Sequence, residues 1–341
     1  MNSSIRNNSL LGFFSLSVGI LFWVNISLGS VNIPFLEVFN ILTGKVSTNN
    51  SWEYIVIHYR LPKAIAAVIA GISLSVSGLI MQTFFRNPLA GPYVLGVSSG
   101  AGLGVALLTL GAGILPFLNI LSSSAFGLVL ASGLGSFLVL LCILIVSKRM
   151  NDATSILIIG LMFSSFTSAI IGILSYFSQA DALKKYTLWS LGNIGGLSWN
   201  AVVMLSLCCI LGLLIVITQL KSLNAFILGD KYAKSLGINL KTTQYSIIIA
   251  TSLLAGSVTA FAGPIAFVGL AVPHIAKLIF KTANHHILFL ATVLLGAITL
   301  LFCDTMSQLP GTDTILPINA ITSILGAPVV IWLMLKKNKY L

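Results

Sequence analysis

Ten long apolar stretches dominate this sequence and limit what it can fold into. Each is about 20 residues long, which is the length that an α-helix needs to cross the hydrocarbon core of a bilayer. None alternates strictly between polar and apolar residues, which disfavours a membrane β-barrel. The sequence therefore predicts an all-α polytopic membrane protein, a single transmembrane domain over residues 1–341 with about ten helices. The predicted spans are 10–29, 62–83, 93–112, 122–147, 153–176, 200–220, 243–262, 265–281, 287–304 and 316–335.

The composition excludes the main soluble alternatives. Hydrophobic residues make up 57% of the 341 residues and charged residues only 7%, whereas about 25% of the residues in soluble domains are charged. So few charges cannot cover the surface of a soluble enzyme, and the apolar content is too high for a disordered chain. Because only Gly263-Pro264 separates the seventh and eighth runs, nine or eleven helices remain an alternative count.

The first apolar run resembles a signal peptide, but we interpret it as an uncleaved span. Only one basic residue, Arg6, precedes it, and its length exceeds the 7 to 15 apolar residues that are typical of a signal peptide. With the N-terminus in the cytoplasm, thirteen of the 18 basic residues lie inside. The positive-inside rule therefore predicts that both termini are cytoplasmic. The five basic residues left outside are Lys45, Arg60, Lys63, Lys184 and Lys185.

The positions of the polar residues favour a transport protein over an enzyme. All seven acidic residues fall in loops or at span ends, so a proton relay through the bundle lacks carriers. An ion-coupled transporter is therefore the weaker alternative, and an intramembrane enzyme lacks paired acids. A phosphate-binding loop is absent too, because Gly44-Lys45 is followed by Val46. A pump of this kind would need energy from a separate subunit.

Neither a metal site nor a nucleic-acid surface is expected. The four cysteines lie in apolar stretches, and the four histidines fall in three separate regions without metal-ligand spacing. The basic residues are dispersed and form no patch with aromatic residues. We therefore expect no catalytic residue, metal or cofactor in this chain, and no nucleic acid partner.

Two patterns concern helix packing. Small residues such as Ala70, Gly71 and Ser75 give the second span a thin flank that lets a neighbouring helix approach closely. In addition, Ala90-Gly91-Pro92 and Ala262-Gly263-Pro264 begin two similar segments. Their predicted positions at opposite membrane faces are those of an inverted repeat.

The cytoplasmic loop between the sixth and seventh spans contains a short predicted helix. Leu228, Tyr232 and Leu236 lie on one face of it, four residues apart. Gly237 is suited to end it. The pattern fits a helix docked in a partner's groove and equally a helix lying on lipid headgroups. The candidate contact residues are Leu228, Gly229, Asp230, Tyr232, Ala233, Lys234, Ser235, Leu236 and Gly237.

A set of motifs, in order and spacing, resembles one known family from about residue 50 to the C-terminus. They are Arg60-Leu61-Pro62-Lys63, Arg86-Asn87-Pro88-Leu89-Ala90, Leu95-Gly96-Val97-Ser98, Trp189-Ser190-Leu191-Gly192, Leu228-Gly229-Asp230, Ser235-Leu236-Gly237, Phe267-Val268-Gly269-Leu270, Pro273-His274 and Gly326-Ala327-Pro328. The sequence thereby resembles the permease subunit of ABC importers for iron chelates, haem and vitamin B12, with the type II importer fold.

The resemblance implies which proteins the permease assembles with and in which membrane it lies. The permease would pair with a second copy of itself or a paralogous permease in a bacterial plasma (inner) membrane. Two cytoplasmic ATPase subunits would bind ATP and Mg and hydrolyse the ATP, and a substrate-binding protein would deliver the cargo. The chain itself would be no enzyme. The cargo implied is an iron chelate, a siderophore or haem, with cobalamin as the alternative.

The resemblance also assigns roles to residues. The loop matching 225–239 would contact the ATPase. Arg60 and Lys63 would dock the binding protein, unless they are interfacial anchors of the second span. A third basic docking position is matched by Gln308, which departs from the family pattern.

The cytoplasmic gate would include Asn87, Pro88 and Thr154. Asn87 has an equally good alternative role, as the first residue of an Asx turn before proline.

Overall fold

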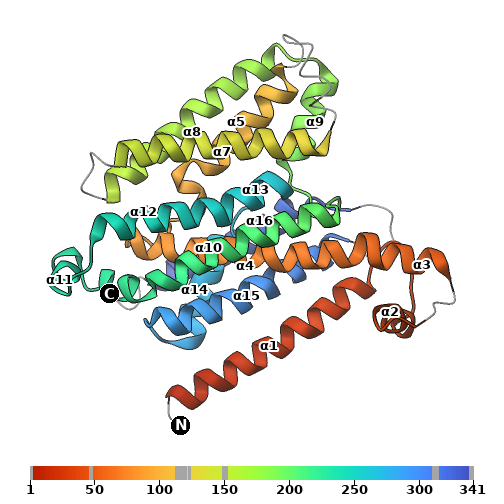
Figure 1. Cartoon of the computed structure of the whole chain (residues 1–341), viewed down its shortest axis with the longest axis horizontal. Helices are drawn as coiled ribbons and strands as arrows, with labels where there is room; N and C mark the ends of the chain where they lie inside the picture. The colour runs from red at the N-terminus through yellow and green to blue at the C-terminus, as the bar shows by residue number, and fades with distance from the viewer. Residues whose placement is uncertain are drawn as a thin grey trace. The chain divides into compact units, whose positions relative to one another are not determined.

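The computed structural model describes residues 3–45, 49–111, 121, 124–147, 153–308 and 315–337, and these residues form helices without a β-strand (Figure 1). The prediction of an all-α polytopic protein is thereby confirmed. The helices are α1 (Ser3–Ser27), α2 (Phe35–Leu42), α3 (Asn50–Ile55), η1 (Val56–Arg60), α4 (Leu61–Phe84), η2 (Pro92–Leu95), α5 (Val97–Thr109), α7 (Ala125–Ser147), α8 (Ala153–Tyr176), α9 (Ala180–Ser190), α10 (Trp199–Phe226), α11 (Asp230–Ser235), α12 (Leu240–Thr251), η4 (Ser252–Gly256), α13 (Ser257–Ala262), α14 (Val268–Phe280), α15 (His285–Ser307) and α16 (Ile318–Lys337).

Each predicted span overlaps a helix, and the span predicted at 93–112 covers η2 and α5 with Gly96 between them. Within the described ranges, seven stretches are long and apolar enough to cross a membrane, and three shorter apolar helices lie in α5, α14 and α16. Two of the seven contain a π-helical turn: Asn50–Phe84 includes η1, and Leu240–Ala262 includes η4. With 13 residues each, α5 and α14 are about 20 Å long, which is shorter than the hydrocarbon core.

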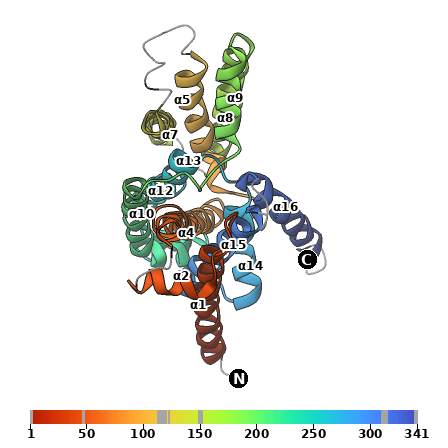
Figure 2. The same cartoon turned by 90° about the vertical axis from the view of Figure 1, so that its right-hand side faces the viewer.

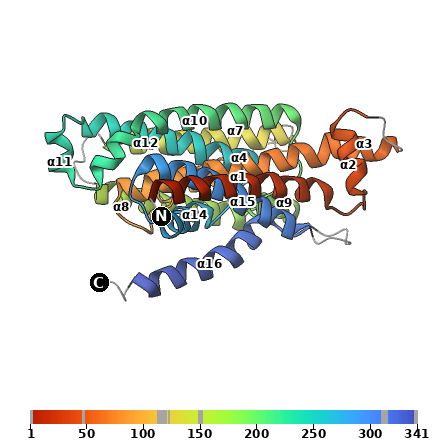
Figure 3. The same ribbon diagram turned by 90° about the horizontal axis from the view of Figure 1, so that it is seen from below.

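Contacts divide the chain into two compact units. The first comprises Met1–Val76, Asn193–Leu207 and Ile265–Leu341, and the second comprises Ser77–Gly192 and Cys208–Pro264. Within the first unit, α1 packs along α15, which also contacts α14 and α16 (Figure 3). Within the second, α5 packs against α7, α8 and α9 (Figure 2).

Within each unit, neighbouring helices approach so closely that their backbones are in contact. In the first unit, a methyl group on Gly71 would lie 2.2 Å from the carbonyl oxygen of Gly296, so α4 and α15 touch at the thin flank seen in the sequence. In the second unit, a methyl group on Gly104 would lie 2.0 Å from the carbonyl oxygen of Ala131, which brings α5 onto α7. Such approaches between membrane helices require small residues.

The two similar segments of the sequence have similar local structures. Gly96, with φ +70°, immediately precedes α5, and Phe267, with φ +65°, immediately precedes α14. Phe267 is held in this left-handed conformation by its surroundings, since its Cβ fits only because Gly326 has no side chain. The neighbouring Ala266 N–H donates to Asn319 Oδ1 at 2.9 Å. Both short helices therefore begin directly after a residue in the left-handed conformation, and the inverted repeat stays a prediction.

Candidate docking and coupling sites

Arg60 ends η1, and its guanidinium binds the carboxyl end of α1. Nη1 donates to the carbonyl oxygens of Ile26 (3.0 Å) and Ser27 (2.8 Å), and Nη2 donates to that of Val31. Gly29 leaves room for this contact, because a Cβ there would lie 2.8 Å from Nη2. Arg60 is only 8% exposed. Its positive charge stabilises the negative end of the α1 dipole.

Lys63, in the first turn of α4, forms an ion pair within the first unit. Its Nζ lies 3.2 Å from Oδ1 of Asp304 on α15. Oδ2 of Asp304 accepts hydrogen bonds from Asn25 Nδ2 (2.8 Å) and Gln308 Nε2 (3.1 Å). Asp304 is 2% exposed, and a buried polar group of this kind needs such partners. Gln308, which replaces the expected third basic residue, completes this cluster.

The cluster around Asp304 was missed by sequence reasoning, which placed this acid at a span end without a partner. The one available signal was an acidic and a basic residue at the same predicted membrane face. The docking role of Arg60 and Lys63 stays a prediction. In this structure both cations have partners within the chain.

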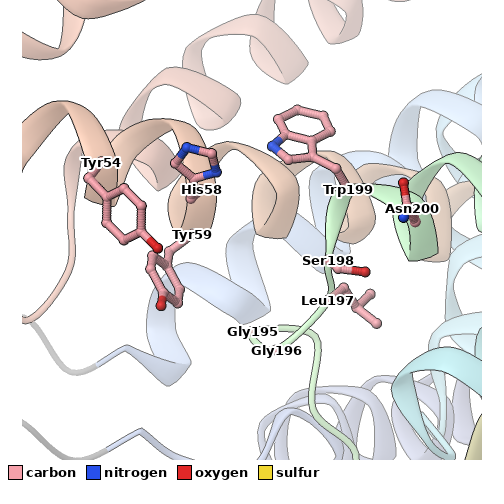
Figure 4. Close-up of a pocket in the computed structure, with 9 residues that line it drawn as sticks. All are labelled: Tyr54, His58, Tyr59, Gly195, Gly196, Leu197, Ser198, Trp199 and Asn200. Atoms are coloured by element: carbon pink, nitrogen blue, oxygen red, sulfur yellow. The ribbon is translucent and has the colours of Figure 1, made fainter. Parts of the chain in front are cut away.

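An open pocket of about 410 Å³ lies beside Lys63 in the first unit (Figure 4). Gly195 is on its rim, and a Cβ there would lie 3.8 Å from Lys63 Cδ. The lining is Tyr54, His58, Tyr59, Gly195, Gly196, Leu197, Ser198, Trp199 and Asn200. In the part of the chain that is described, three or more His, Cys, Asp or Glu side chains do not converge into a metal site.

Aromatic rings dominate the pocket, and contacts fix their positions. The ring of Tyr54 lies 4.7 Å from that of His58 and 5.9 Å from that of Tyr59, measured between centroids. The indole Nε1 of Trp199 donates to the carbonyl oxygen of Ile57 at 3.1 Å. Figure 4 shows these rings projecting from α3, from η1 and from the start of α10. Rigid, exposed Tyr and Trp side chains are common at the centres of protein interfaces. No motif in the sequence pointed to this pocket.

The predicted contact residues for the ATPase, residues 228–237 (the coupling segment), fold as a tight helical turn in the second unit. α11 covers Asp230–Ser235 only, so it is shorter than the spacing of Leu228 and Leu236 suggests. Gly237, with φ +79°, ends it: its N–H donates to Lys234 O, and the next N–H donates to Ala233 O at 3.1 Å. This is the Schellman pattern, in agreement with the predicted helix stop.

The segment leaves apolar side chains uncovered. Leu228, Tyr232 and Leu236 are all more than half exposed, whereas Ala233 is buried. Asp230 at the first turn and Lys234 at the last turn complement the helix dipole. Gly229, with φ +107°, makes the sharp entry into the turn. The remaining candidate, Ser235, donates its hydroxyl to the carbonyl oxygen of Lys231.

The predicted gate residues lie between α4 and α5 and at the start of α8. Asn87 Oδ1 accepts a hydrogen bond from the N–H of Leu89 at 2.9 Å, which is an Asx turn across Pro88. Thr154 lies in the first turn of α8, and its side chain is outside the described part of the chain. The gating role therefore stays a prediction, and Asn87 has the turn geometry of the alternative interpretation.

Arg86, next to Asn87, makes a contact that sequence reasoning did not anticipate. Its Nε donates to the carbonyl oxygen of Phe226 at 3.0 Å, and its guanidinium forms an ion pair with Asp230. The turn after α4 and the coupling segment are therefore joined by one side chain.

Comparisons with known proteins agree with this arrangement of helices. Residues 17–336 match the model of the FecCD transport family. The chain is 33% identical to the hemin transport system permease protein HmuU of Yersinia pestis, over 99% of each chain. It is 36% identical to the vitamin B12 import system permease protein BtuC of Salmonella typhi, over 84% of this chain and 85% of the relative.

A solved structure also matches over nearly the whole length. It is a metal-chelate type ABC transporter in an inward-facing conformation, with a TM-score of 0.84 and 26% sequence identity. The match covers 96% of this chain and 99% of the other. The type II importer fold expected from the sequence is therefore present. The chain belongs to the FecCD transport family and is a membrane-spanning permease of the ABC importer class.

Proposed function

We propose that this permease carries an iron chelate, haem or a siderophore, into the bacterial cytoplasm, driven by ATP hydrolysis in a separate subunit. The observation that carries the cargo assignment is the likeness to a hemin permease over 99% of both chains. Cobalamin is the second candidate, because the chain is 36% identical to a vitamin B12 permease, although over only 84% of its length. Both ligands are bulky and carry their metal with them, so the pathway needs no metal site of its own.

The ATPase contact is assigned to residues 228–237. Three exposed apolar side chains on a tight, well-capped turn suit insertion into a groove of another protein. The alternative, a helix lying on lipid headgroups, is less well supported, because a six-residue helix presents little apolar surface to a membrane.

The binding protein is assigned to the surface that includes Arg60, Lys63 and the aromatic pocket. The pocket supplies rigid rings for contact, and the charge of Arg60, whose partners are neutral carbonyls, supplies electrostatic steering of an acidic partner. The functional unit would hold two permease chains, the second a copy or a paralogue, and two ATPase subunits. Both termini would be cytoplasmic.

Reconstitution tests this proposal. The chain would be co-purified with its ATPase subunit, placed in proteoliposomes with ATP inside, and supplied with the cognate binding protein outside. We expect ATP-dependent uptake of iron-55 hemin or of a ferric siderophore, exceeding uptake of cobalt-57 cobalamin. Uptake of cobalamin alone would support the second candidate. Uptake by the chain without the ATPase, driven by an ion gradient, would contradict the assignment as a whole.

A further inference from the structure

Arg86 occupies a backbone position that normally favours glycine. After α4 ends at Phe84, the N–H of Arg86 donates to Thr83 O (3.2 Å) and the N–H of Asn87 donates to Gln82 O (3.1 Å). These two bonds form a Schellman motif, whose C′ residue is left-handed and usually Gly. Arg86 takes this position with φ +47°. A non-glycine residue is strained there, and such strain persists where the surroundings require it.

The side chain of Arg86 provides the reason for that choice. Its guanidinium binds two acceptors of the second unit. One is the last carbonyl oxygen of α10, at Phe226, and the other is the carboxylate of Asp230 at the start of α11. A glycine at this position would relieve the backbone and lose both contacts. The Phe84 and Phe226 rings meet edge to face, with centroids 6.2 Å apart. The ends of α4 and α10 are thus joined by an apolar and a charged contact.

The backbone of Arg86 leads directly into a rigid turn. Asn87 is held from both sides, by its own N–H to Gln82 and by its side chain to the N–H of Leu89. A force applied to the Arg86 guanidinium therefore reaches Asn87 and Pro88 through one peptide unit.

We propose that Arg86 transmits movement of the coupling segment 228–237 to the turn at Asn87 and Pro88. The inference rests on the proposed function, in which that segment contacts the ATPase. Arg86 is a positioning residue: it touches no cargo, and it acts by fixing the distance between Asp230 and the turn. Displacement of Asp230 by the ATPase would pull on the guanidinium, and the rigid turn would follow.

The alternative is that Arg86 only caps the carboxyl end of α10. Two variants separate the interpretations. Arg86→Gly removes the side chain and places glycine where the left-handed conformation favours it. Asp230→Asn removes the ion pair and leaves the bond from Nε to Phe226 in place. If Arg86 only caps α10, Arg86→Gly should change the stability of the protein, and Asp230→Asn should leave the ATP-dependent movement of the turn unchanged.

The experiment measures movement of the turn directly. In the complete complex with ATPase subunits, Leu89→Cys places a thiol on the exposed side of the turn. Its labelling by a charged maleimide is followed with and without ATP and vanadate. The four native cysteines lie in the apolar helices α7, α10 and α15, which limits background labelling. Hydrolysis of ATP and the melting temperature are recorded for each variant.

With Arg86 present, we expect ATP to change the labelling rate at least about fivefold, the lower range of allosteric coupling. In Arg86→Gly and in Asp230→Asn the change should fall below about twofold, and in Arg86→Gly, which lies outside the segment assigned to the ATPase, ATP hydrolysis should continue. The double variant should be no worse than Arg86→Gly alone, because both residues act through one contact. Lys221→Gln, which removes an exposed cation from α10, is the control and should retain the full change.

Two results would overturn the inference. If both single variants keep the full ATP-dependent change, Arg86 does not transmit movement, although the proposed function stands. If ATP leaves labelling unchanged even with Arg86 present, the assigned coupling and this inference both fail.

Discussion

Lys63 of α4 and Asp304 of α15 form a buried ion pair, with Nζ 3.2 Å from Oδ1. Asn25 of α1 and Gln308 also bind this carboxylate, so three helical elements of the first unit meet at one charge. A buried charge that loses its partner is strongly destabilising. This cluster therefore secures the packing of α1, α4 and α15 at one end.

Asp304→Ala should lower the free energy of unfolding by about 3 kcal/mol, because it leaves Lys63 charged and unpaired. The double variant Lys63→Met with Asp304→Leu should recover much of that loss, since both charges are removed. Unfolding of the purified chain by SDS in mild detergent micelles measures both. Asp181→Ala, at an exposed acid of α9, is the control and should stay within about 0.5 kcal/mol. A single variant as stable as the wild type would contradict this role.

Gly71→Ala should separate α4 from α15, because the new methyl group would lie 2.2 Å from the carbonyl oxygen of Gly296. We expect a loss of about 1 to 3 kcal/mol in the free energy of unfolding, as for other overpacked positions. Gly19→Ala is a matched control, since a methyl group there meets nothing within 4 Å and lies inside the helix α1. The same SDS titration applies. Equal stability of the two variants would show that the helices can move apart without cost.

Trp199→Ala should weaken docking of the binding protein at least about fivefold, which corresponds to the 1 kcal/mol or more of an interface hot spot. Tyr54→Ala should act in the same direction, because its ring is exposed beside His58 in the same pocket. Titration of labelled binding protein onto permease in nanodiscs gives the dissociation constants. Tyr176→Ala, at a highly exposed tyrosine of α8, should leave them unchanged. Unaltered affinity in both pocket variants would place docking elsewhere.

Tyr232→Ala and Lys234→Glu should each reduce ATP-dependent uptake at least about tenfold, because both alter the exposed face of α11 that we assign to the ATPase. Both side chains are exposed, so the melting temperature of the isolated chain should hold. Co-purification of ATPase subunits and uptake in proteoliposomes are the two measurements. Lys184→Glu, on the exposed side of α9, is the charge-reversal control. Normal assembly and uptake in both variants would remove α11 from the coupling site.

Much of the architecture could be predicted because its causes are local. An apolar run of sufficient length forms a helix in a bilayer whatever its neighbours are, so the helices at the predicted spans follow from the sequence. Gly237 ends α11 because its left-handed conformation depends on its own lack of a side chain. The Asx turn at Asn87 was likewise one of the two roles open from the sequence. The break at Gly263 has the same local origin, with φ +74° after α13.

The binding partners of the arginines could not be predicted from the local sequence. Each of the three that the structure describes binds carbonyls at the carboxyl end of a helix: Arg6 at Phe280 of α14, Arg60 at the end of α1, and Arg86 at Phe226 of α10. From the sequence they were a topology signal, a docking residue and part of a motif. All three cations lie where a helix dipole or a carboxylate compensates their charge.

The sequence by itself determined the helical class and the family, because periodicity, length and motif spacing are properties of neighbouring residues. Only the tertiary structure decided which charges meet. Lys63 meets Asp304 because α4 and α15 pack closely at Gly71 and Gly296. Arg86 meets Asp230 because the turn after α4 lies beside the end of α10. Those pairings depend on packing distances between helices, which no single stretch of sequence encodes.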